Sequence, residues 1–393
     1  MIVKIDNLSH DFKGITRVGD KVTFVSKTLP GEVVSIKLLE EKKKYNLAIV
    51  NDYIEKSSDR VIPKCPYFDR CGGCDICFIK YDRQLEYKKN IVIDIFKKYA
   101  NMEINPDIIT NNNVFGYRNK ITLRVLNNHL ALYEEDSNNL VNISKCLLVN
   151  DNINDVIEVL NTISLEGINE VIIRGDKEIM LIINGNCDYK NIISLLKDRV
   201  SSIIYNNKVI YGNEYINIKV GNYNYRVYPD SFFQVNTDMI KLLYDRVKEY
   251  AGIGSSLLDL YCGAGTIGIY LSSNFKSVHG IEINRSAIKG ANINKEINSI
   301  GNISFIEGTT SDVKEIKEDV VIVDPPRSGL DDKTREALIK ATSKRIVYVS
   351  CNPITLARDI NILKDYYNFK DIVIFDNFPN TKHVESIVLL ERK

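Results

Sequence analysis

The 393-residue sequence lacks three features that would narrow its class at once: an excess of charge, a long apolar run and low-complexity sequence. The formal net charge is +1, so a polyanionic partner must be met by local basic patches. No apolar run approaches the length of a membrane-spanning helix, and the first residues do not resemble a signal peptide. We therefore expect a folded cytoplasmic protein of two or three domains, with no membrane contact and no obligate protein partner.

Cysteine is plentiful, with eight in the chain. In a reducing compartment cysteines are expected to be ligands, nucleophiles or core residues and not disulfides. Cys65, Cys71 and Cys74 have C-x5-C-x2-C spacing, and the two glycines before Cys74 let the backbone wrap closely around an inorganic centre. A distant cysteine often completes an iron–sulfur site, and Cys146 would be that fourth ligand. Zinc with four thiolates is the competing interpretation, which spacing does not exclude.

The N-terminal segment is expected to form a small barrel over residues 1–60. Short alternating runs are separated there by Gly, Pro and charged turns, at 21–25, 31–36 and 46–50. The basic run Lys42, Lys43 and Lys44 would either attract RNA phosphates or form a solvated hairpin tip.

Residues 61–220 are expected to form a central α+β domain that carries the cysteine group and binds RNA. A helix with a basic face is predicted over 84–98, and it can pack on the catalytic domain instead. Arg118 and Lys120, beside Tyr117, form either a basic and aromatic cluster for nucleic acid or a solvated strand edge.

The C-terminal part, residues 221–393, alternates helices with short buried strands and predicts a Rossmann-like α/β domain. A strand over 257–260 breaks into a glycine-rich turn, where Gly263 and Gly265 let the backbone pass close to a ligand. Glu282 and Asp324 each end a later strand, and an acidic residue at such a place accepts hydrogen bonds from ribose hydroxyls. The turn lacks a third phosphate-binding glycine, so S-adenosylmethionine fits better than NAD.

The apolar run before Cys351 predicts a buried strand that ends in Ser-Cys-Asn-Pro at residues 350–353. Open α/β sheets bind ligands at the carboxyl ends of their strands, so Cys351 is the candidate nucleophile. A lone cysteine at such a place would more often be a small core residue. The motifs around it favour the functional interpretation.

Taken together, the motifs resemble those of the RumA/TrmA family of S-adenosylmethionine-dependent RNA uracil-5-methyltransferases. They lie at residues 231–236, 259–266, 324–329, 350–353 and 383–386. The resemblance is closest to the RumA branch, which acts on 23S ribosomal RNA and carries a TRAM barrel and a 4Fe-4S cluster. It implies a class I methyltransferase domain, a TRAM-like OB barrel at the N-terminus and 23S rRNA as the partner.

The resemblance also implies roles for individual residues. Cys351 matches the nucleophile and Glu385 the base, and the cluster ligands match Cys65, Cys71, Cys74 and Cys146. The positions expected to contact the cofactor are Gln234, Tyr261, Gly263, Thr266, Glu282, Thr309 and Asp324. Thr309 stands where the family often has Asn or an acidic side chain near the adenine.

The chemistry explains why both a thiol and a carboxylate are required. Carbon 5 of uracil is a weak nucleophile, and a thiolate added to carbon 6 places electron density on carbon 5 so that it can attack a methyl group. A carboxylate then removes the carbon-5 proton. We expect Glu385 to remain near its ionised form, with Lys382 and His383 as candidate cations that favour the thiolate.

Three other functions stay open on sequence grounds. The RNA can be transfer RNA in place of ribosomal RNA. The Asp-Pro-Pro-Arg loop at 324–327 also fits methylation of exocyclic amines, whereas cytosine-5 methylation usually needs a second cysteine that residues 325–328 lack. A non-catalytic iron–sulfur RNA-binding protein would explain the first two domains but not the C-terminal motifs.

Overall fold

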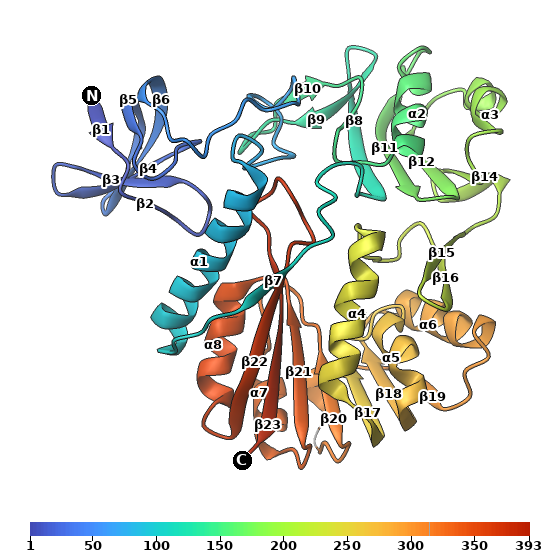
Figure 1. Cartoon of the computed structure of the whole chain (residues 1–393). Coiled ribbons are helices and arrows are strands. Elements are labelled where there is room, and N and C mark those ends of the chain that lie inside the picture. The colour runs from blue at the N-terminus through green and yellow to red at the C-terminus, as the bar shows by residue number, and fades with distance from the viewer. Residues whose placement is uncertain (314) are drawn as a thin grey trace.

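Three regions, each built on its own sheet, follow one another along the chain in the computed structural model, which describes residues 1–313 and 315–393 (Figure 1). The first is a six-stranded sheet of order β1-β5-β6-β4-β3-β2. Its strands are β1 (Ile2–Lys4), β2 (Asn7–Leu8), β3 (Gly14–Val18), β4 (Lys21–Val25), β5 (Val33–Glu41) and β6 (Tyr45–Glu55). The Asp6 N–H donates to the Ile15 carbonyl at 2.8 Å and joins the end of β1 to β3, so the sheet curls over a small apolar core.

The basic run of residues 42–44 lies at the tip of the hairpin between β5 and β6. All three lysines are exposed there, and Lys42 forms an ion pair with Glu40.

The second region is a seven-stranded sheet of order β10-β9-β8-β11-β12-β13-β14. Its strands are β8 (Lys120–Leu126), β9 (His129–Tyr133), β10 (Leu140–Asn142), β11 (Ile168–Gly175), β12 (Ile179–Gly185), β13 (Ser202–Tyr205) and β14 (Lys208–Gly212). The helices α2 (Asp151–Leu160) and α3 (Lys190–Leu196) bury their apolar sides against it in one core cluster. The cysteine-rich segment joins this sheet to the barrel region, since the Gly72 N–H donates to the carbonyl of Tyr133 in β9.

The third region is an eight-stranded sheet of order β19-β18-β17-β20-β21-β23-β22-β7. Its strands are β17 (Gly254–Leu260), β18 (Phe275–Glu282), β19 (Ile303–Glu307), β20 (Val320–Val323), β21 (Arg345–Ser350), β22 (Tyr367–Phe375), β23 (Glu385–Arg392) and β7 (Asp107–Ile109). The five strands from β17 to β21 are parallel, and β20 is buried along its whole length, as expected of a strand covered by helices on both faces. This is the α/β fold expected from the sequence.

Helices cover both faces of this sheet: α4 (Thr237–Ala251), α5 (Thr266–Leu271), α6 (Arg285–Ile297), α7 (Asp332–Lys340) and α8 (Pro353–Leu363). On one side of β17 lie β18 and then β19. On its other side lies β20, followed by β21 and the later strands. The order reverses between β17 and β20, and ligands bind at the carboxyl edge of a sheet at such a point. A hairpin of β15 (Ile216–Val220) and β16 (Tyr223–Val227) packs into the same core.

Two segments that lie between the first two sheets in sequence pack on this third region, and for the helix this is the second of the two placements considered above. Strand β7 pairs with β22, and α1 (Tyr81–Ala100) packs on α8 (Figure 1). The apolar side of α1 is buried against the third sheet's core, which explains its position. Its predicted basic face is partly internal, because Lys88 is fully buried and its ammonium lies 2.6 Å from a carboxylate oxygen of Asp376.

No helix in the described part of the chain is long and apolar enough to span a membrane.

Candidate active site

The glycine-rich turn after β17 is built to face a ligand with its backbone. Tyr261, Gly263 and Gly265 all have positive φ, at 63°, 54° and 75°. A Cβ on Gly263 would meet no atom within 4 Å, so the backbone there borders open space. A Cβ on Gly265 would lie 2.4 Å from the ring of Phe305, so glycine is required for packing at that point. The turn therefore presents main-chain groups to an open cradle before α5 begins.

Glu282, at the end of β18, is fixed against this turn. Its carboxylate accepts hydrogen bonds from the Gly263 N–H at 3.2 Å and from the Asn284 N–H at 2.8 Å. Each carboxylate oxygen has a second lone pair, which can still accept a hydrogen bond from a ligand hydroxyl.

A cavity at the carboxyl edge of β17 and β20 collects most of the predicted cofactor residues, and we call it the cofactor cavity. Its walls include Gln234, Tyr261, Gly263, Thr266 and Asp324. The remaining two predicted residues are outside its lining: Glu282 adjoins it through Gly263, and the Thr309 hydroxyl accepts a hydrogen bond from the Ser311 N–H.

Two carboxyl groups that line the cofactor cavity have pKa values above the ordinary value of an aspartate. Burial raises the pKa of Asp259 to about 8, and its Oδ1 is buried with no partner within the described structure. Burial likewise raises the pKa of Asp324 to about 7. The open glycine cradle, the unpaired buried oxygen and the carboxyl groups fit a nucleoside that carries positive charge, as S-adenosylmethionine does.

The structure brings Cys351 and Glu385 together. Strands β21 and β23 are antiparallel, and their last paired residues are Ser350 and Ser386. Cys351 directly follows the first and Glu385 directly precedes the second, so both lie where this ladder ends. They are close enough that the charge of Glu385 raises the pKa of the Cys351 thiol.

The electrostatics of this pair differ from the expectation. Burial, followed by the charges of Glu385 and Asp324, raises the pKa of Cys351 to about 11. Burial and the neighbouring Asp324 also raise the pKa of Glu385 well above its ordinary value. The prediction that Glu385 stays near its ionised form is therefore wrong for the ligand-free protein, because its carboxyl group is 2% exposed and adjoins a second carboxyl group.

The predicted cations are also corrected by the structure. Lys382 forms an ion pair with Asp75 at 3.2 Å, and burial together with nearby cations lowers the pKa of His383 to about 4, so His383 is neutral. The cation that favours the Cys351 thiolate is Arg327, which lowers the pKa of this thiol and lines the same cavity of about 230 Å³. Its Nη2 lies 3.1 Å from His383 Nδ1. The Asp-Pro-Pro-Arg motif contained this signal, but the sequence alone did not assign it.

Five cysteines line one cavity of about 170 Å³ beside the second sheet, which we call the thiol pocket. Four of them are the predicted ligands Cys65, Cys71, Cys74 and Cys146, and the fifth is Cys77. Four basic side chains complete its polar lining, with no carboxylate among the lining residues: Lys64, Arg118, Lys120 and Lys145. Burial raises the pKa of Cys71 to about 11. No group of three or more His, Cys, Asp or Glu side chains in the described ranges is arranged to hold a metal ion as the structure stands.

The proposed RNA cluster around residue 117 is not at the surface. Tyr117 is 5% exposed, and its hydroxyl donates to the carbonyl of Pro379 at 2.9 Å. Arg118 lines the thiol pocket. Tyr117 is thus unable to stack on a base in this arrangement, whereas Arg118 and Lys120 are half-buried and line the thiol pocket, and their contact with RNA stays a prediction.

Comparison with known proteins agrees with this site. The family model described as tRNA (Uracil-5-)-methyltransferase matches residues 191–393. An uncharacterized RNA methyltransferase of Halalkalibacterium halodurans is 33% identical, covering 100% of this chain and 96% of its own. Another, of Aquifex aeolicus, is 33% identical over 99% of this chain and 98% of its own.

A solved structure is similar over the whole length. It is the Pyrococcus abyssi tRNA (uracil-54, C5)-methyltransferase in complex with S-adenosyl-L-homocysteine. The TM-score is 0.81 with 27% identity, and the match covers 99% of this chain and 100% of that one.

Fold, cofactor cavity and relatives together define an S-adenosylmethionine-dependent RNA methyltransferase. More narrowly, the chain belongs to the RNA uracil-5-methyltransferases, the TrmA/RumA family, and it methylates carbon 5 of uracil in RNA.

Proposed function

We propose that methylation proceeds through a transient bond between Cys351 and carbon 6 of the target uracil, with Glu385 as the base. The observation that supports this proposal is the register of β21 and β23, whose last pair, Ser350 and Ser386, is followed by Cys351 on one strand and preceded by Glu385 on the other. The thiol lines a cavity of about 230 Å³ that can receive a base, while Asp324, in the same loop as Arg327, lines the cofactor cavity.

The steps balance as follows. The Cys351 thiolate adds to carbon 6, and the electron pair of the 5,6 double bond moves into an enolate. S-adenosylmethionine, when bound, would supply a methyl group on its sulfonium. Carbon 5 of the enolate would take this group as the methyl–sulfur bond breaks, with the neutral thioether S-adenosylhomocysteine as the leaving group. Ionised Glu385 then removes the carbon-5 proton, the double bond forms again and the thiolate leaves. Because the pKa of Glu385 is raised, this carboxyl group must lose its proton, for example when the substrate binds, before it can act as the base.

RNA carrying 5-fluorouridine tests this mechanism, because fluorine cannot leave as a proton and the adduct stays covalent. We expect a methylated protein–RNA band on a denaturing gel, absent from Cys351→Ala. A matched control is Cys187→Ala, which changes a half-buried thiol outside both cavities. Failure of the wild-type protein to form this band would refute the covalent mechanism.

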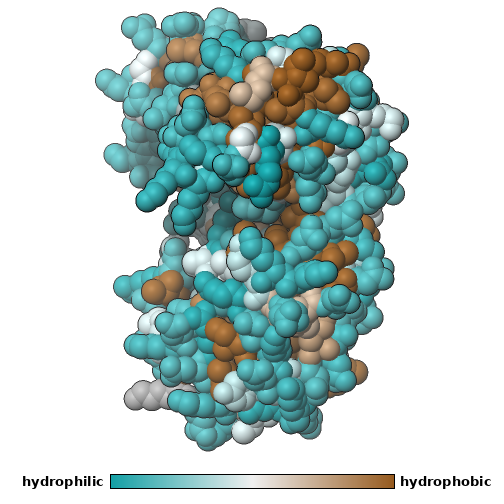
Figure 2. All heavy atoms as spheres, turned by 90° about the vertical axis from the view of Figure 1, so that its left-hand side faces the viewer, coloured by the Kyte–Doolittle hydropathy of each residue, from teal (hydrophilic) through white to brown (hydrophobic). Residues whose placement is uncertain are grey.

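We also propose a path for the RNA between the barrel region and α1. A cavity of about 570 Å³ lies there, and Figure 2 shows this side of the molecule hollowed between its upper and lower parts. Phe24, Tyr45 and Lys98 are among its lining residues, and Ile354 of α8 lines both this cavity and the one at Cys351. Aromatic and basic side chains of this kind hold single-stranded nucleotides. The target uridine must leave its stack to reach the thiol, at a cost of a few kcal/mol.

The thiol pocket supports a 4Fe-4S cluster better than zinc. Its volume of about 170 Å³ equals that of roughly five or six water molecules, whereas a zinc ion held by four thiolates fills the space between them. Four thiolates on a cluster leave net negative charge, which the four basic side chains of the pocket can balance. The cysteines and these cations would hold the cluster, whose role is structural because methyl transfer moves no electrons between groups. Iron and sulfide analysis of anaerobically purified protein tests this, and one zinc per chain without iron would refute it.

The RNA target that we propose is 23S ribosomal RNA, by resemblance to the RumA branch. Transfer RNA is the second candidate, because the Pyrococcus abyssi protein is named for uracil 54 of tRNA and matches this chain along its whole length. Unmodified 23S rRNA and tRNA transcripts, incubated with the protein and S-adenosylmethionine, separate the two. Mass spectrometry should find 5-methyluridine in the ribosomal RNA, and its presence in tRNA alone would refute our choice.

A further inference from the structure

Asp359 is a buried carboxylate close to the catalytic strand end, and the proposed mechanism gives it no task. It lies in α8 and is fully buried. Its two oxygens accept five hydrogen bonds, from Leu330 N–H, the Tyr348 hydroxyl, Arg335 and, twice, Arg358. These donors come from the Asp-Pro-Pro-Arg loop, β21, α7 and α8. One side chain therefore joins β21, which leads to Cys351, to the loop that carries Arg327 and to the helices α7 and α8.

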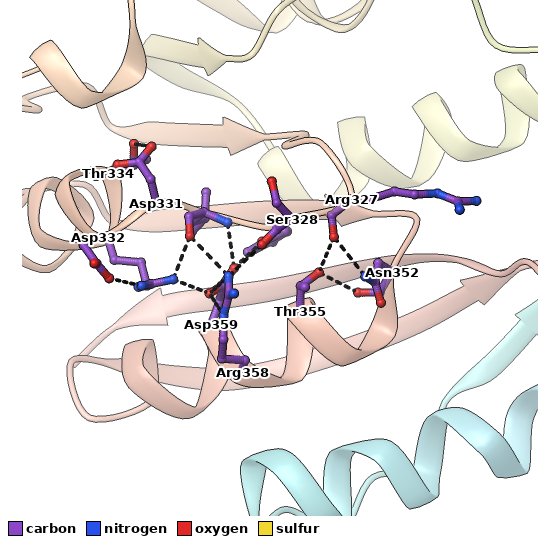
Figure 3. Close-up of polar contacts among 12 residues, drawn as sticks. Arg327, Ser328, Asp331, Asp332, Thr334, Asn352, Thr355, Arg358 and Asp359 are labelled. Atoms are coloured by element: carbon purple, nitrogen blue, oxygen red, sulfur yellow. Dashed lines mark hydrogen bonds and ion pairs between the residues drawn. The ribbon is translucent and has the colours of Figure 1, made fainter. Parts of the chain in front are cut away.

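The same contacts fix the backbone of the loop that carries Arg327 (Figure 3). Arg358 donates to the carbonyls of Ser328 and Leu330 at 3.0 and 3.2 Å, and Arg335 donates to the Leu330 carbonyl at 2.7 Å. The loop is pressed tightly onto this group, since a Cβ on Gly329 would lie 2.6 Å from an Asp359 oxygen.

Arg327 is anchored through its main-chain carbonyl, and its side chain makes separate contacts. Its carbonyl accepts hydrogen bonds from Asn352 Nδ2 at 2.9 Å and from the Thr355 hydroxyl at 3.2 Å. Figure 3 shows its side chain pointing away from the Asp359 group. The guanidinium lines the cavity of Cys351 and contacts His383 there. The backbone anchor thus determines where this cation lies.

We propose that Asp359 is a positioning residue for Cys351: its carboxylate ties the Arg327 loop to β21 and α8 and so keeps the guanidinium of Arg327 beside the thiol. The proposal rests on the nucleophilic role of Cys351 proposed above. Two carboxyl groups, Asp324 and Glu385, oppose the thiolate, and Arg327 favours it. If this loop moved, Arg327 would leave the thiol, and only the two carboxyl groups would then act on the pKa of Cys351.

The test follows the rate at which iodoacetamide alkylates Cys351 between pH 7 and 11, measured on its own peptide by mass spectrometry. Arg327→Met should raise the pKa of this thiol by about one to three units, the effect of losing an opposite charge. Asp359→Asn should raise it by about one unit, so that the rate at pH 8 falls about tenfold. In the Arg327→Met background Asp359→Asn should cause no further fall, because it acts through Arg327.

The matched control is Asp332→Asn, which removes an exposed ion pair with the same Arg335 and should leave the alkylation rate unchanged. If Asp359→Asn fails to fold, Thr355→Val removes one hydrogen bond to the Arg327 carbonyl and should slow alkylation about twofold to threefold. An unchanged rate in these variants, or an equal fall in the Arg327→Met background, would overturn the proposal. Wild-type adduct formation with fluorouridine RNA shows separately whether the mechanism itself holds.

Discussion

Cys351 and the cysteines of the thiol pocket carry the same functional group in opposite surroundings. Burial raises the pKa of both Cys351 and Cys71 to about 11. The charges of Glu385 and Asp324 raise the pKa of Cys351 and Arg327 lowers it, in a cavity also lined by Lys88, Lys382 and Asp11. Four basic side chains and no carboxylate line the thiol pocket. A thiolate that is a permanent metal ligand needs its negative charge stabilised at all times. A thiolate that acts as a nucleophile must also be released from the substrate at the end of the reaction. The neighbours therefore distinguish a ligand from a nucleophile where burial alone does not.

The sharpest test of this comparison is Cys351→Ala. We expect methyl transfer to fall at least about ten-thousandfold, because no other group supplies the bond to carbon 6. The melting temperature should stay within about 2 °C, since a half-buried thiol contributes little to packing. Tritium transfer from labelled S-adenosylmethionine and calorimetry measure the two quantities. A large loss of stability would place Cys351 with the structural cysteines.

Glu385→Gln should give the next largest effect. Without a base the carbon-5 proton remains, so turnover should fall about a hundredfold to ten-thousandfold. The covalent adduct should still form with ordinary RNA and should accumulate. Rapid-quench gels with a single turnover of enzyme would show it, and unchanged turnover would contradict the assignment of Glu385.

Cys71→Ala tests the other half of the comparison. It should remove the bound inorganic group and lower the free energy of unfolding by more than about 3 kcal/mol, since a structural centre contributes directly to folding. Metal analysis and denaturant unfolding measure this, with Cys187→Ala as the control that should change neither. If the variant lost its metal but kept its free energy of unfolding, the thiol pocket would not need an inorganic centre to fold.

The smallest effect is the pH dependence of cofactor affinity. Asp324 has a pKa of about 7, so it is neutral at pH 6 and ionised at pH 8. S-adenosylmethionine is cationic at its sulfonium, so its affinity should rise with pH, by at most about tenfold over this range. Titration calorimetry measures the rise. In Asp324→Asn the rise in affinity should be smaller but not absent, because Asp259 in the same cavity has a pKa of about 8. An undiminished rise in this variant would assign the pH dependence to another group.

Local patterns predicted the third region well because each signal was contained in a few consecutive residues. The apolar run of β20 and the glycine-rich turn after β17 need only their own residues to specify a buried strand and a cradle. Six of the seven predicted cofactor residues lie at or just after a strand end or begin a helix, so their position at one edge follows from the parallel topology, whereas Gln234 lies in the loop before α4. Five of the seven line one cavity.

Longer-range features escaped prediction because their partners are far along the chain. Lys88 counted as part of a basic helix face, yet it is buried by Asp376, 288 residues away. Strand β7 is too short to show which sheet it joins, and only its pairing with β22 places it. Tyr117 and Arg118 read as a surface cluster because nothing nearby in sequence shows what covers them.

The sequence by itself determined the α/β fold, the glycine turn and the motifs that end in Cys351 and precede Glu385, since these depend on residues next to one another. Only the tertiary structure decided the protonation of Glu385, the choice of Arg327 over Lys382 and His383 as cation, and the basic lining of the thiol pocket. The physical reason is that a pKa depends on burial and on charges nearby in space, and neither is encoded in the spacing of a motif.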